Sequence, residues 1–272
     1  SAIRKVGHSG TLDPDASGVL PVFIGRAVRL ARFITDLSKA YRAMIEFGSA
    51  TATYDSAGAV TRRGDPSALD RDRIETALNA FCGLIEQIPP MYSAIKYEGK
   101  PLYHLARLGR EVVRQPRRVM IHRLSVIQWQ NPWLTLEIEC GKGTYIRSLA
   151  HDLGQALGCP AHLKELIRTR SGPFRIEEAV SLAELERSFR AGDWQRYVQP
   201  PEAAVSHLGS IEVDDSGTED FLHGKSLFLP TSPPERGEGE YRRVHHSPDG
   251  RFLGIVRFDE GELLWRPVIV FS

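Results

Sequence analysis

Hydrophobic residues recur every three or four positions in several segments of this 272-residue chain. This spacing is typical of helices that bury one face. It predicts helices at residues 26–37, 70–81, 101–108, 144–157 and 177–189. Thr144 is expected to cap the fourth of these helices, which ends at Gly158. Arg147 lies outside the hydrophobic stripe of that helix, so the pattern leaves its side chain free to face a cleft.

A second pattern, in which hydrophobic and polar residues alternate, is typical of half-buried strands. Strands are predicted at residues 41–47, 92–97, 120–129, 133–139, 252–258 and 263–271. The polar segments 49–68 and 229–240 are expected to form long loops. From about Val205 onward, short strands and turns replace the helices. We therefore expect two domains, at residues 1–200 and 205–272.

The composition is ordinary for a folded protein, with 42% hydrophobic and 25% charged residues. No hydrophobic run is as long as a membrane span and no signal segment opens the chain, so we expect a cytoplasmic protein without membrane contact. Cys82, Cys140 and Cys159 are odd in number and far apart, which argues against a disulfide framework and a zinc site. His245 and His246 would point to opposite faces of a strand, so no metal is expected.

Charge is distributed unevenly along the chain, although the net charge is only +1. Residues 1–175 hold 25 Lys and Arg against 16 Asp and Glu, whereas residues 176–272 hold 10 against 18. A basic body is expected for a protein that binds a phosphate-rich partner. Taken alone, the charge is explained equally well by a solvated face. The candidates for contacts with backbone phosphates are Lys96, Arg107, Arg110, Arg114, Arg117 and Arg118.

Asp13 is a candidate for chemistry because of the loop that surrounds it. Glycines stand on both sides of it, and Pro14 follows it directly. Pro14 fixes its own φ and biases Asp13 towards an extended conformation, which places the carboxylate on a stiff loop. The same Asp-Pro pair is also a common helix start, with Asp as the cap and Pro in the first turn. The dipeptide by itself leaves both interpretations open.

The longer stretch Gly-His-Ser-Gly-Thr-Leu-Asp-Pro-Asp-Ala-Ser-Gly-Val-Leu-Pro-Val, residues 7–22, resembles the signature of the TruB family of tRNA pseudouridine synthases. Further matches follow in the family's order, namely Lys39-Ala40-Tyr41, Gln-Ile-Pro-Pro-Met-Tyr-Ser-Ala-Ile-Lys at 87–96, and Gly-Thr-Tyr-Ile-Arg at 143–147. The resemblance is strong up to about Phe174 and weaker beyond it. It implies the pseudouridine synthase fold, an α+β fold in which helices flank a mixed or antiparallel sheet, with a small C-terminal β domain similar to the PUA domain.

The resemblance implies that the protein isomerises uridine to pseudouridine in the T loop of tRNA, at position 55. The N1–C1′ bond would break, and the base would rotate and rejoin through C5, after the nucleotide is flipped into a pocket. This chemistry requires one carboxylate and neither a metal nor an organic cofactor. Nucleophilic and glycal routes both begin at that carboxylate, so the sequence does not separate them. The implied partner is the T arm of tRNA, and we expect a monomer.

The resemblance also implies roles for individual residues. Asp13 would be the catalytic carboxylate, Tyr41 would stack on the flipped uracil and accept the C2′ proton, and Arg147 would pair with the carboxylate. The residues implied for substrate binding are His8, Leu166, Lys96, Tyr145 and Asp55. Several have ordinary structural alternatives. Tyr41 could equally be an ordinary aromatic residue of a strand, and Leu166 an ordinary core leucine. The side chain of Arg147 could face a phosphate or solvent, and His8 could be a surface histidine.

The sequence departs from the family pattern at two places. Family members carry Thr-Asp-Thr-x-Asp where this chain has Thr51-Ala52-Thr53-Tyr54-Asp55, so the first acid is missing and only Asp55 is carried over. An upstream Lys-Pro-x-Gly-x-Thr-Ser-like segment of the family has no match here. Both departures keep open a second hypothesis, a catalytically silent protein that binds and folds tRNA. A guide-dependent relative is a third hypothesis, which the lack of a long basic tail disfavours.

Overall fold

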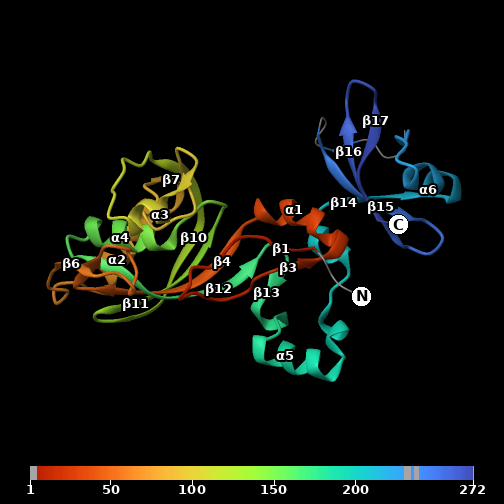
Figure 1. Cartoon of the computed structure of the whole chain (residues 1–272). Coiled ribbons are helices and arrows are strands. Elements are labelled where there is room, and N and C mark those ends of the chain that lie inside the picture. The colour runs from red at the N-terminus through yellow and green to blue at the C-terminus, as the bar shows by residue number, and fades with distance from the viewer. Residues whose placement is uncertain (1–4, 230–233, 236–238, 272) are drawn as a thin grey trace. The chain divides into compact units, whose positions relative to one another are not determined.

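The computed structural model describes residues 5–229, 234–235 and 239–271 of the chain. Seven strands within these residues form one sheet, in the order β13 (Phe174–Arg175), β12 (Ala161–Ser171), β4 (Lys39–Phe47), β11 (Trp133–Cys140), β10 (Arg117–Gln130) and β7 (Gly83–Gln87), with β2 (Ser17–Gly18) against β12. Neighbouring strands are antiparallel except β2, which runs parallel to β12. The expected α+β fold with a mixed sheet is confirmed (Figure 1).

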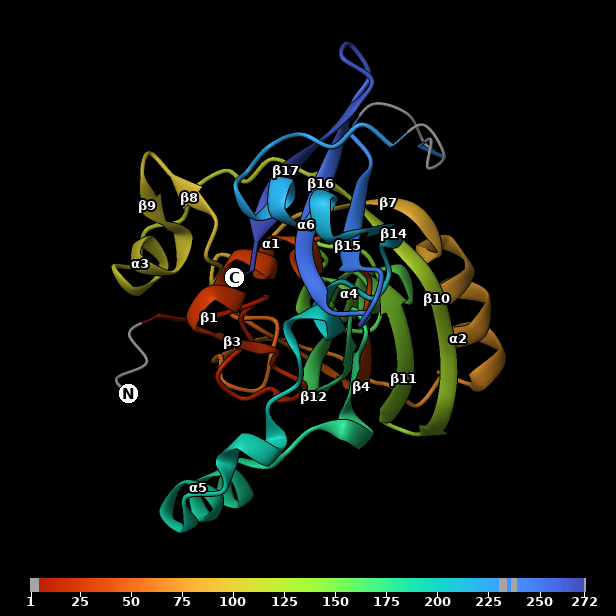
Figure 2. The same cartoon turned by 90° about the vertical axis from the view of Figure 1, so that its right-hand side faces the viewer.

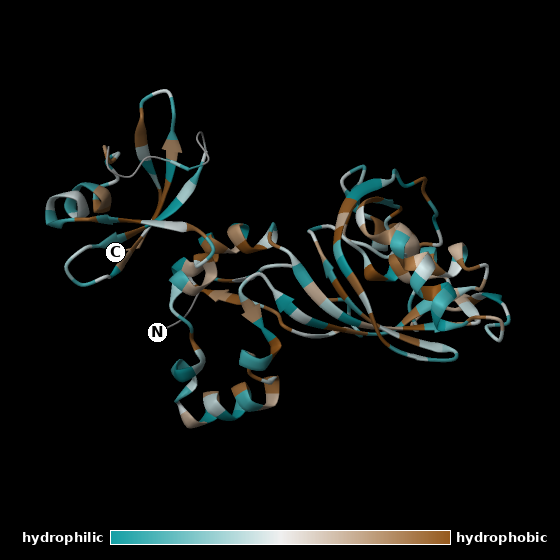
Figure 3. Ribbon diagram, turned by 180° about the vertical axis from the view of Figure 1, so that it is seen from behind, coloured by the Kyte–Doolittle hydropathy of each residue, from teal (hydrophilic) through white to brown (hydrophobic). Residues whose placement is uncertain are grey.

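Two helices, α2 (Arg71–Leu78) and α4 (Ile146–Ala156), pack against this sheet (Figure 2). Successive side chains of a strand point to opposite faces, and along β4 every second residue from Ala43 to Phe47 is buried. These side chains form one hydrophobic core with the apolar stripes of the two helices. Hydrophobic and polar stretches alternate visibly along the strands in Figure 3. Tyr41 precedes Ala43 by two positions, so it shares the core face of β4.

Helix starts were only partly predictable from the sequence. The side chain of Asp70 caps α2 by accepting a hydrogen bond from the Arg73 amide at 2.8 Å. The predicted cap of α4 is wrong, because Tyr145 occupies that position and makes no side-chain cap bond. Thr144 instead donates its hydroxyl proton to the Gly141 carbonyl at 3.0 Å. The buried side chain of Gln87, on β7, hydrogen-bonds to the backbone of Tyr145.

Several predicted elements differ from those observed. The segment 49–68, predicted as a loop, contains a short hairpin of β5 (Ser49–Thr51) and β6 (Val60–Arg63). The predicted strand 92–97 is wrong for most of its length, because only Lys96–Tyr97 forms a strand, β8, which pairs with β9 (Lys100–Pro101). The hydrophobic residues of this region serve a different purpose. They pack with α3 (Leu102–Arg107) in a small cluster of their own, formed by Met91, Leu102 and Leu105.

The remaining helix predictions are confirmed in outline. The segment 26–37 holds a 3₁₀ helix, η1 (Gly25–Leu30), followed by α1 (Ala31–Thr35). The segment 177–189 begins its helix late, at α5 (Leu182–Ala191), where the Ser181 hydroxyl accepts from the Glu184 amide. The hydrophobic pattern does not predict β12, because charged residues interrupt its alternation at positions 164, 165, 168 and 170.

The structure divides into two compact units. Residues 10–21 and 35–179 form the large-sheet unit described above, and the described parts of 1–9, 22–34 and 180–272 form the small-sheet unit. The small sheet has the order β14 (Gly209–Val213), β15 (Tyr241–His246), β16 (Phe252–Asp259) and β17 (Leu264–Val270), with α6 (Asp215–Leu222) beside it. The predicted strands 252–258 and 263–271 are confirmed. Part of the predicted loop 229–240 lies outside the described residues.

The start of the chain belongs to the small-sheet unit. There β1 (Val6–His8) pairs with β3 (Val22–Ile24). The Arg29 guanidinium donates to the Val270 carbonyl at 2.7 Å, and Phe33 meets Tyr241 edge to face. The predicted domains 1–200 and 205–272 stay a prediction, because the two units follow spatial contacts and not chain order. Among the described residues, no helix has the length and hydrophobicity needed to cross a membrane.

Candidate active site

The loop that carries Asp13 is fixed to β12 and does not begin a helix. Ser17 and Gly18 pair in parallel with Ile167 and Arg168, and the Val19 amide donates to the Arg168 carbonyl at 2.8 Å. Asp13 itself opens a tight turn, in which its carbonyl accepts from the Ala16 amide at 3.0 Å. The helix-cap interpretation of the Asp-Pro pair is therefore wrong. The side chain of Asp13 is 39% exposed.

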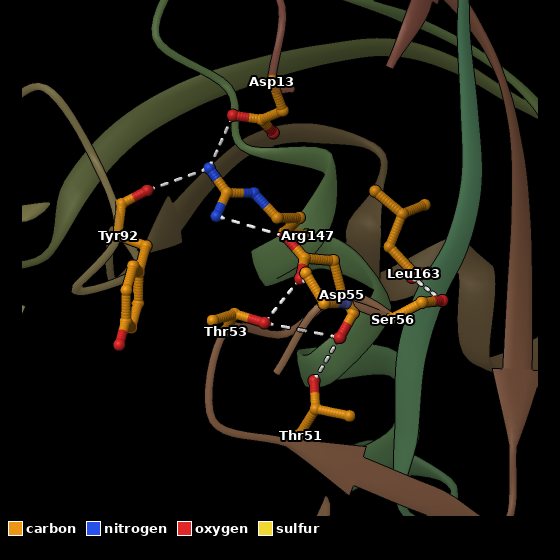
Figure 4. A network of polar contacts seen from close by, with 9 residues as sticks. Asp13, Thr51, Thr53, Asp55, Ser56, Tyr92, Arg147 and Leu163 are labelled. Carbon is orange, nitrogen blue, oxygen red and sulfur yellow. Dashed lines mark hydrogen bonds and ion pairs between the residues drawn. The ribbon is translucent and has the colours of Figure 1, made fainter. Parts of the chain in front are cut away.

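Arg147, in the first turn of α4, is the partner of Asp13. Its side chain is only 6% exposed, so the expectation of a solvent-facing arginine is wrong. Nη2 donates to Asp13 Oδ1 at 2.8 Å and to the Tyr92 carbonyl at 3.0 Å (Figure 4). A buried arginine bound in this way keeps an acid oriented and favours its ionised form.

Asp55 approaches the other terminal nitrogen of the same guanidinium. Its Oδ2 lies 3.5 Å from Nη1 of Arg147. The loop around Asp55 holds the carboxylate in place, because Oδ1 accepts from the Thr53 hydroxyl and from the Ala57 amide. The Asp55 carbonyl in turn accepts from the Thr51 hydroxyl at 2.6 Å. The structure thus brings Asp13, Arg147 and Asp55 into one charged network (Figure 4).

Burial and the neighbouring charges shift the pKa of Asp13 in opposite directions. Burial raises the pKa of its carboxyl group above the usual value for aspartate, and the Arg147 guanidinium pulls that pKa down again. The nearby carboxylates of Asp55 and Asp15 raise it further, with a net upward direction. Asp13 is consequently an ion-paired acid that still takes up a proton more readily than a solvent-exposed aspartate.

Tyr41 lies on β4 directly opposite Arg168 of β12. Burial raises the pKa of its phenol to about 12, a shift that the Arg168 guanidinium opposes. The negative charge of Asp13 also acts on this phenol, which places the two side chains in the same electrostatic environment. Tyr41 therefore stays protonated at neutral pH, which suits stacking and hydrogen-bond donation better than proton abstraction from the resting state.

Two further predicted residues lie in the large-sheet unit. Leu166 stands opposite Ala43 on β12 and packs, partly buried, against the edge of the core. It therefore joins the core-face row that also holds Tyr41. Tyr145 precedes α4, and burial raises the pKa of its phenol, on which the charges of Arg147 and Asp13 also act. Of the two, Tyr145 is the one on which the charges of the Asp13 network act.

The structure does not bring Lys96 into this network. Lys96 is exposed in the hairpin of β8 and β9, and within the described residues no contact joins it to Asp13, Tyr41 or Arg147. His8 is exposed at the end of β1 and belongs to the small-sheet unit. Their implied roles in substrate binding stay predictions. No group of three or more His, Cys, Asp or Glu residues in the described parts of the chain is placed to hold a metal.

Two residues that hold the elements of the site, Gln87 and Arg168, were not predicted from the sequence. The side-chain amide of Gln87, on β7, accepts from the Tyr145 backbone amide at 3.0 Å and donates to the Tyr145 carbonyl at 3.3 Å. Gln87 thereby holds the start of the helix that carries Arg147. Its only signal in the sequence is its place at the head of the motif at residues 87–96. Arg168, a charged residue inside a strand, also escaped notice.

Two models of known protein families match this chain. The N-terminal domain of TruB family pseudouridylate synthases matches residues 1–146, and the C-terminal domain of tRNA pseudouridylate synthase B matches residues 147–206. The chain belongs to the TruB family of pseudouridylate synthases. The predicted resemblance is confirmed, and with it the assignment to the pseudouridine synthase class of isomerases.

Curated relatives in the TruB family match nearly the whole chain. A tRNA pseudouridine synthase B of Dehalococcoides mccartyi is 44% identical over 268 residues, which cover 98% of this chain and 87% of the relative. One from Thiobacillus denitrificans is 41% identical over 266 residues with the same two coverages. One from Symbiobacterium thermophilum is 48% identical over 225 residues, 82% of this chain and 73% of the relative.

Solved structures confirm the fold of the family. A Cbf5–Nop10–Gar1 complex contains a chain that aligns with a TM-score of 0.75 and 27% identity, covering 99% of this chain and 76% of that one. An H/ACA RNP bound to a substrate RNA containing 2′-deoxyuridine aligns with a TM-score of 0.74 and 25% identity, covering 99% and 77%. The two similarities extend over almost the entire sequence described here.

Proposed function

We propose that this TruB-family enzyme isomerises uridine 55 in the T loop of tRNA, with Asp13 as the catalytic carboxylate and without a cofactor. The observation that carries the proposal is the 2.8 Å contact between Asp13 and the buried Arg147, made from a loop of the family signature. The relatives named tRNA pseudouridine synthase B support tRNA as the substrate. A tRNA substrate also supports the expectation of a cytoplasmic enzyme.

The reaction exchanges one glycosidic bond for another. The C1′–N1 bond breaks, the uracil rotates, and a C1′–C5 bond forms, after which C5 loses its proton to solvent and N1 carries one. Asp13 is the group that would act at the sugar, either on C1′ as a nucleophile or as the base that starts elimination. Arg147 keeps its carboxylate oriented, as a pre-organised catalytic group requires.

We assign the binding of the flipped base to Tyr41 and Leu166. Tyr41 and Leu166 come from the neighbouring strands β4 and β12, on the face that packs against α4. An aromatic ring and an aliphatic side chain are the surfaces on which a base extruded from an RNA loop stacks. In this role Tyr41 works as a neutral phenol, in accordance with its raised pKa.

The large-sheet unit also carries the charges expected for tRNA. Lys96 lies on β8, Arg107 at the end of α3, and Arg117 and Arg118 at the start of β10. Contacts of such side chains with phosphates contribute affinity but do not read the base sequence. We therefore assign the binding of the T arm to this segment and the chemistry to the network of Asp13.

The decisive experiment replaces Asp13 with Asn and measures tritium release from tRNA labelled at C5 of uridine. We expect near-normal tRNA binding and a loss of turnover of at least about 10³-fold, because both routes begin at the Asp13 carboxylate. Asp15→Asn, an exposed acid of the same loop, is the matched control and should retain turnover. Wild-type tritium release by Asp13→Asn would refute the assignment. Absence of pseudouridine after incubation with the wild type would refute the proposed function as a whole.

A further inference from the structure

The two ends of the Asp13 loop meet at a single side chain. Arg168 of β12 donates from Nε to the Val19 carbonyl at 2.7 Å and from Nη2 to the Gly10 carbonyl at 3.1 Å. Gly10 precedes Asp13 by three residues and Val19 follows it by six. One guanidinium therefore bridges the loop on both sides of the catalytic carboxylate.

The backbone of Arg168 holds the same loop from below. Its carbonyl accepts from the Val19 amide at 2.8 Å, and the residue pairs with Gly18 in the parallel β2–β12 contact. A Cβ atom at Gly18, where φ is +104°, would lie 2.2 Å from the Arg168 carbonyl oxygen. Glycine is thus required for the loop to approach this residue so closely. The loop and Arg168 are fitted to one another at backbone level.

The environment of the Arg168 side chain is unusual for an arginine. The residue is only 2% exposed, and among the described residues no carboxylate lies within ion-pair distance of it. Its donors instead serve two backbone carbonyls, and the residue lies directly opposite Tyr41, on whose phenol its charge acts. A buried guanidinium is costly, and an apolar residue of similar volume would serve packing as well or better. The side chain is therefore placed where it is for its hydrogen bonds.

We propose that Arg168 is a positioning residue that fixes the Asp13 loop and the phenol of Tyr41 relative to each other, so that the carboxylate faces the sugar of the base held by Tyr41. This inference rests on the proposed function of Asp13. Because Arg147 orients the Asp13 carboxylate itself, the two arginines have separate tasks. Arg147 aims the side chain, and Arg168 sets the backbone that carries it.

The test compares Arg168→Lys with Arg170→Lys. A lysine keeps the positive charge but cannot bridge two carbonyls through a rigid fork. Arg170 lies on the same strand, and its guanidinium binds Glu139 and Ser38 away from the loop. We expect single-turnover rates of pseudouridine formation to fall about 10- to 100-fold for Arg168→Lys and less than about twofold for Arg170→Lys. Both variants should bind tRNA within about twofold of the wild type.

Rescue by a small cation separates positioning from loss of folding. Arg168→Ala leaves a cavity in which a free guanidinium ion can replace the missing donors. We expect guanidinium chloride at about 10–50 mM, well below denaturing concentrations, to raise the single-turnover rate of Arg168→Ala several-fold and to leave the wild type unchanged. Sodium chloride at equal ionic strength is the control.

Three outcomes would overturn the proposal. The first is a wild-type rate in Arg168→Lys. The second is a rate loss in Arg168→Lys that equals the loss of protein able to bind tRNA stoichiometrically. The third is the same rate for Arg168→Ala with guanidinium chloride and with sodium chloride. If Asp13→Asn keeps its turnover while the Arg168 variants lose theirs, the role of Asp13 is refuted and that of Arg168 in activity remains.

Discussion

Oδ2 of Asp55 lies 3.5 Å from Nη1 of Arg147, on a guanidinium whose other terminal nitrogen binds Asp13. Two carboxylates, 42 residues apart in the sequence, thus share one buried cation. Burial raises the pKa of Asp13 most strongly, the charge of Arg147 lowers it, and the charge of Asp55 raises it further. Burial and the balance between these charges together set the pH at which Asp13 becomes ionised.

Replacing Asp55 with Asn removes one negative charge from this network. The pKa of Asp13 should fall, because burial and the remaining acid still raise it but Asp55 no longer does. The acidic limb of the kcat profile should move to lower pH. We also expect kcat at neutral pH to fall about tenfold, or ~1.4 kcal/mol in the barrier, because Arg147 loses an orienting contact. A limb that moved to higher pH would contradict this account.

Replacing Arg147 with Met should move the same limb in the opposite direction. Burial then raises the pKa of Asp13 without the opposing guanidinium. As the pH is lowered, the variant should lose its activity at a higher pH than the wild type does. We also expect kcat to fall about 10²- to 10³-fold. Pre-steady-state rates measured from pH 5 to 9 test both effects. Arg147→Lys, which restores the charge without the fork, should return the limb but not the full rate.

The raised pKa of Tyr41 leads us to expect that the folded protein loses stability at alkaline pH. Its pKa is about 12 in the folded protein, mainly because of burial, and near 10 when unfolded. A raised folded pKa contributes stability below pH 10 that is lost as the pH rises towards 12. The free energy of unfolding should decline over that window by roughly 2–3 kcal/mol from this group. Denaturant titrations of Tyr41→Phe should show a correspondingly smaller decline, and an equal decline would contradict the prediction.

We expect the protein to become more stable when the negative charge of Asp152, on α4, is removed. Burial raises the pKa of its carboxyl group to about 6, so the folded state carries a penalty once the group ionises. This penalty is present above pH 6 and disappears as the pH falls towards 4. After allowance for solvent screening, Asp152→Asn should stabilise the protein by roughly 1–2 kcal/mol at pH 8 and very little at pH 4. Thermal unfolding at both pH values tests this, with the exposed Asp72→Asn as control.

Lys96 predicts an effect on affinity but not on chemistry. It is exposed in the hairpin of β8 and β9, where it is expected to bind a phosphate. Lys96→Gln should weaken tRNA binding and reduce the slope of log K against log salt by about 0.7–0.9. The single-turnover rate at saturating tRNA should not change. Arg71→Gln on α2, whose side chain pairs with Glu75, is the control and should keep the wild-type slope.

Local information in the sequence was sufficient for many elements. The alternation of residues 120–129 and 133–139 and the helical spacing of 70–81 and 144–157 correspond to β10, β11, α2 and α4, because each element buries one face and leaves the other polar. The motifs around Asp13, Tyr41 and Arg147 were equally visible, since they are short runs of adjacent residues. None of these signals depends on knowing which strands lie side by side.

What only the tertiary structure decided are the contacts between distant segments. Arg147 gave a sequence signal of an arginine off the hydrophobic stripe, yet it is buried because two acids and a carbonyl from three other segments surround it. Arg168 is one of the charged residues because of which the hydrophobic pattern does not predict β12, and its donors are satisfied by a loop some 150 residues earlier. A periodic pattern reports whether a side chain faces the core. The pattern carries no information about which groups that side chain contacts. For a charged residue these contacts determine whether its burial is tolerated in the folded protein.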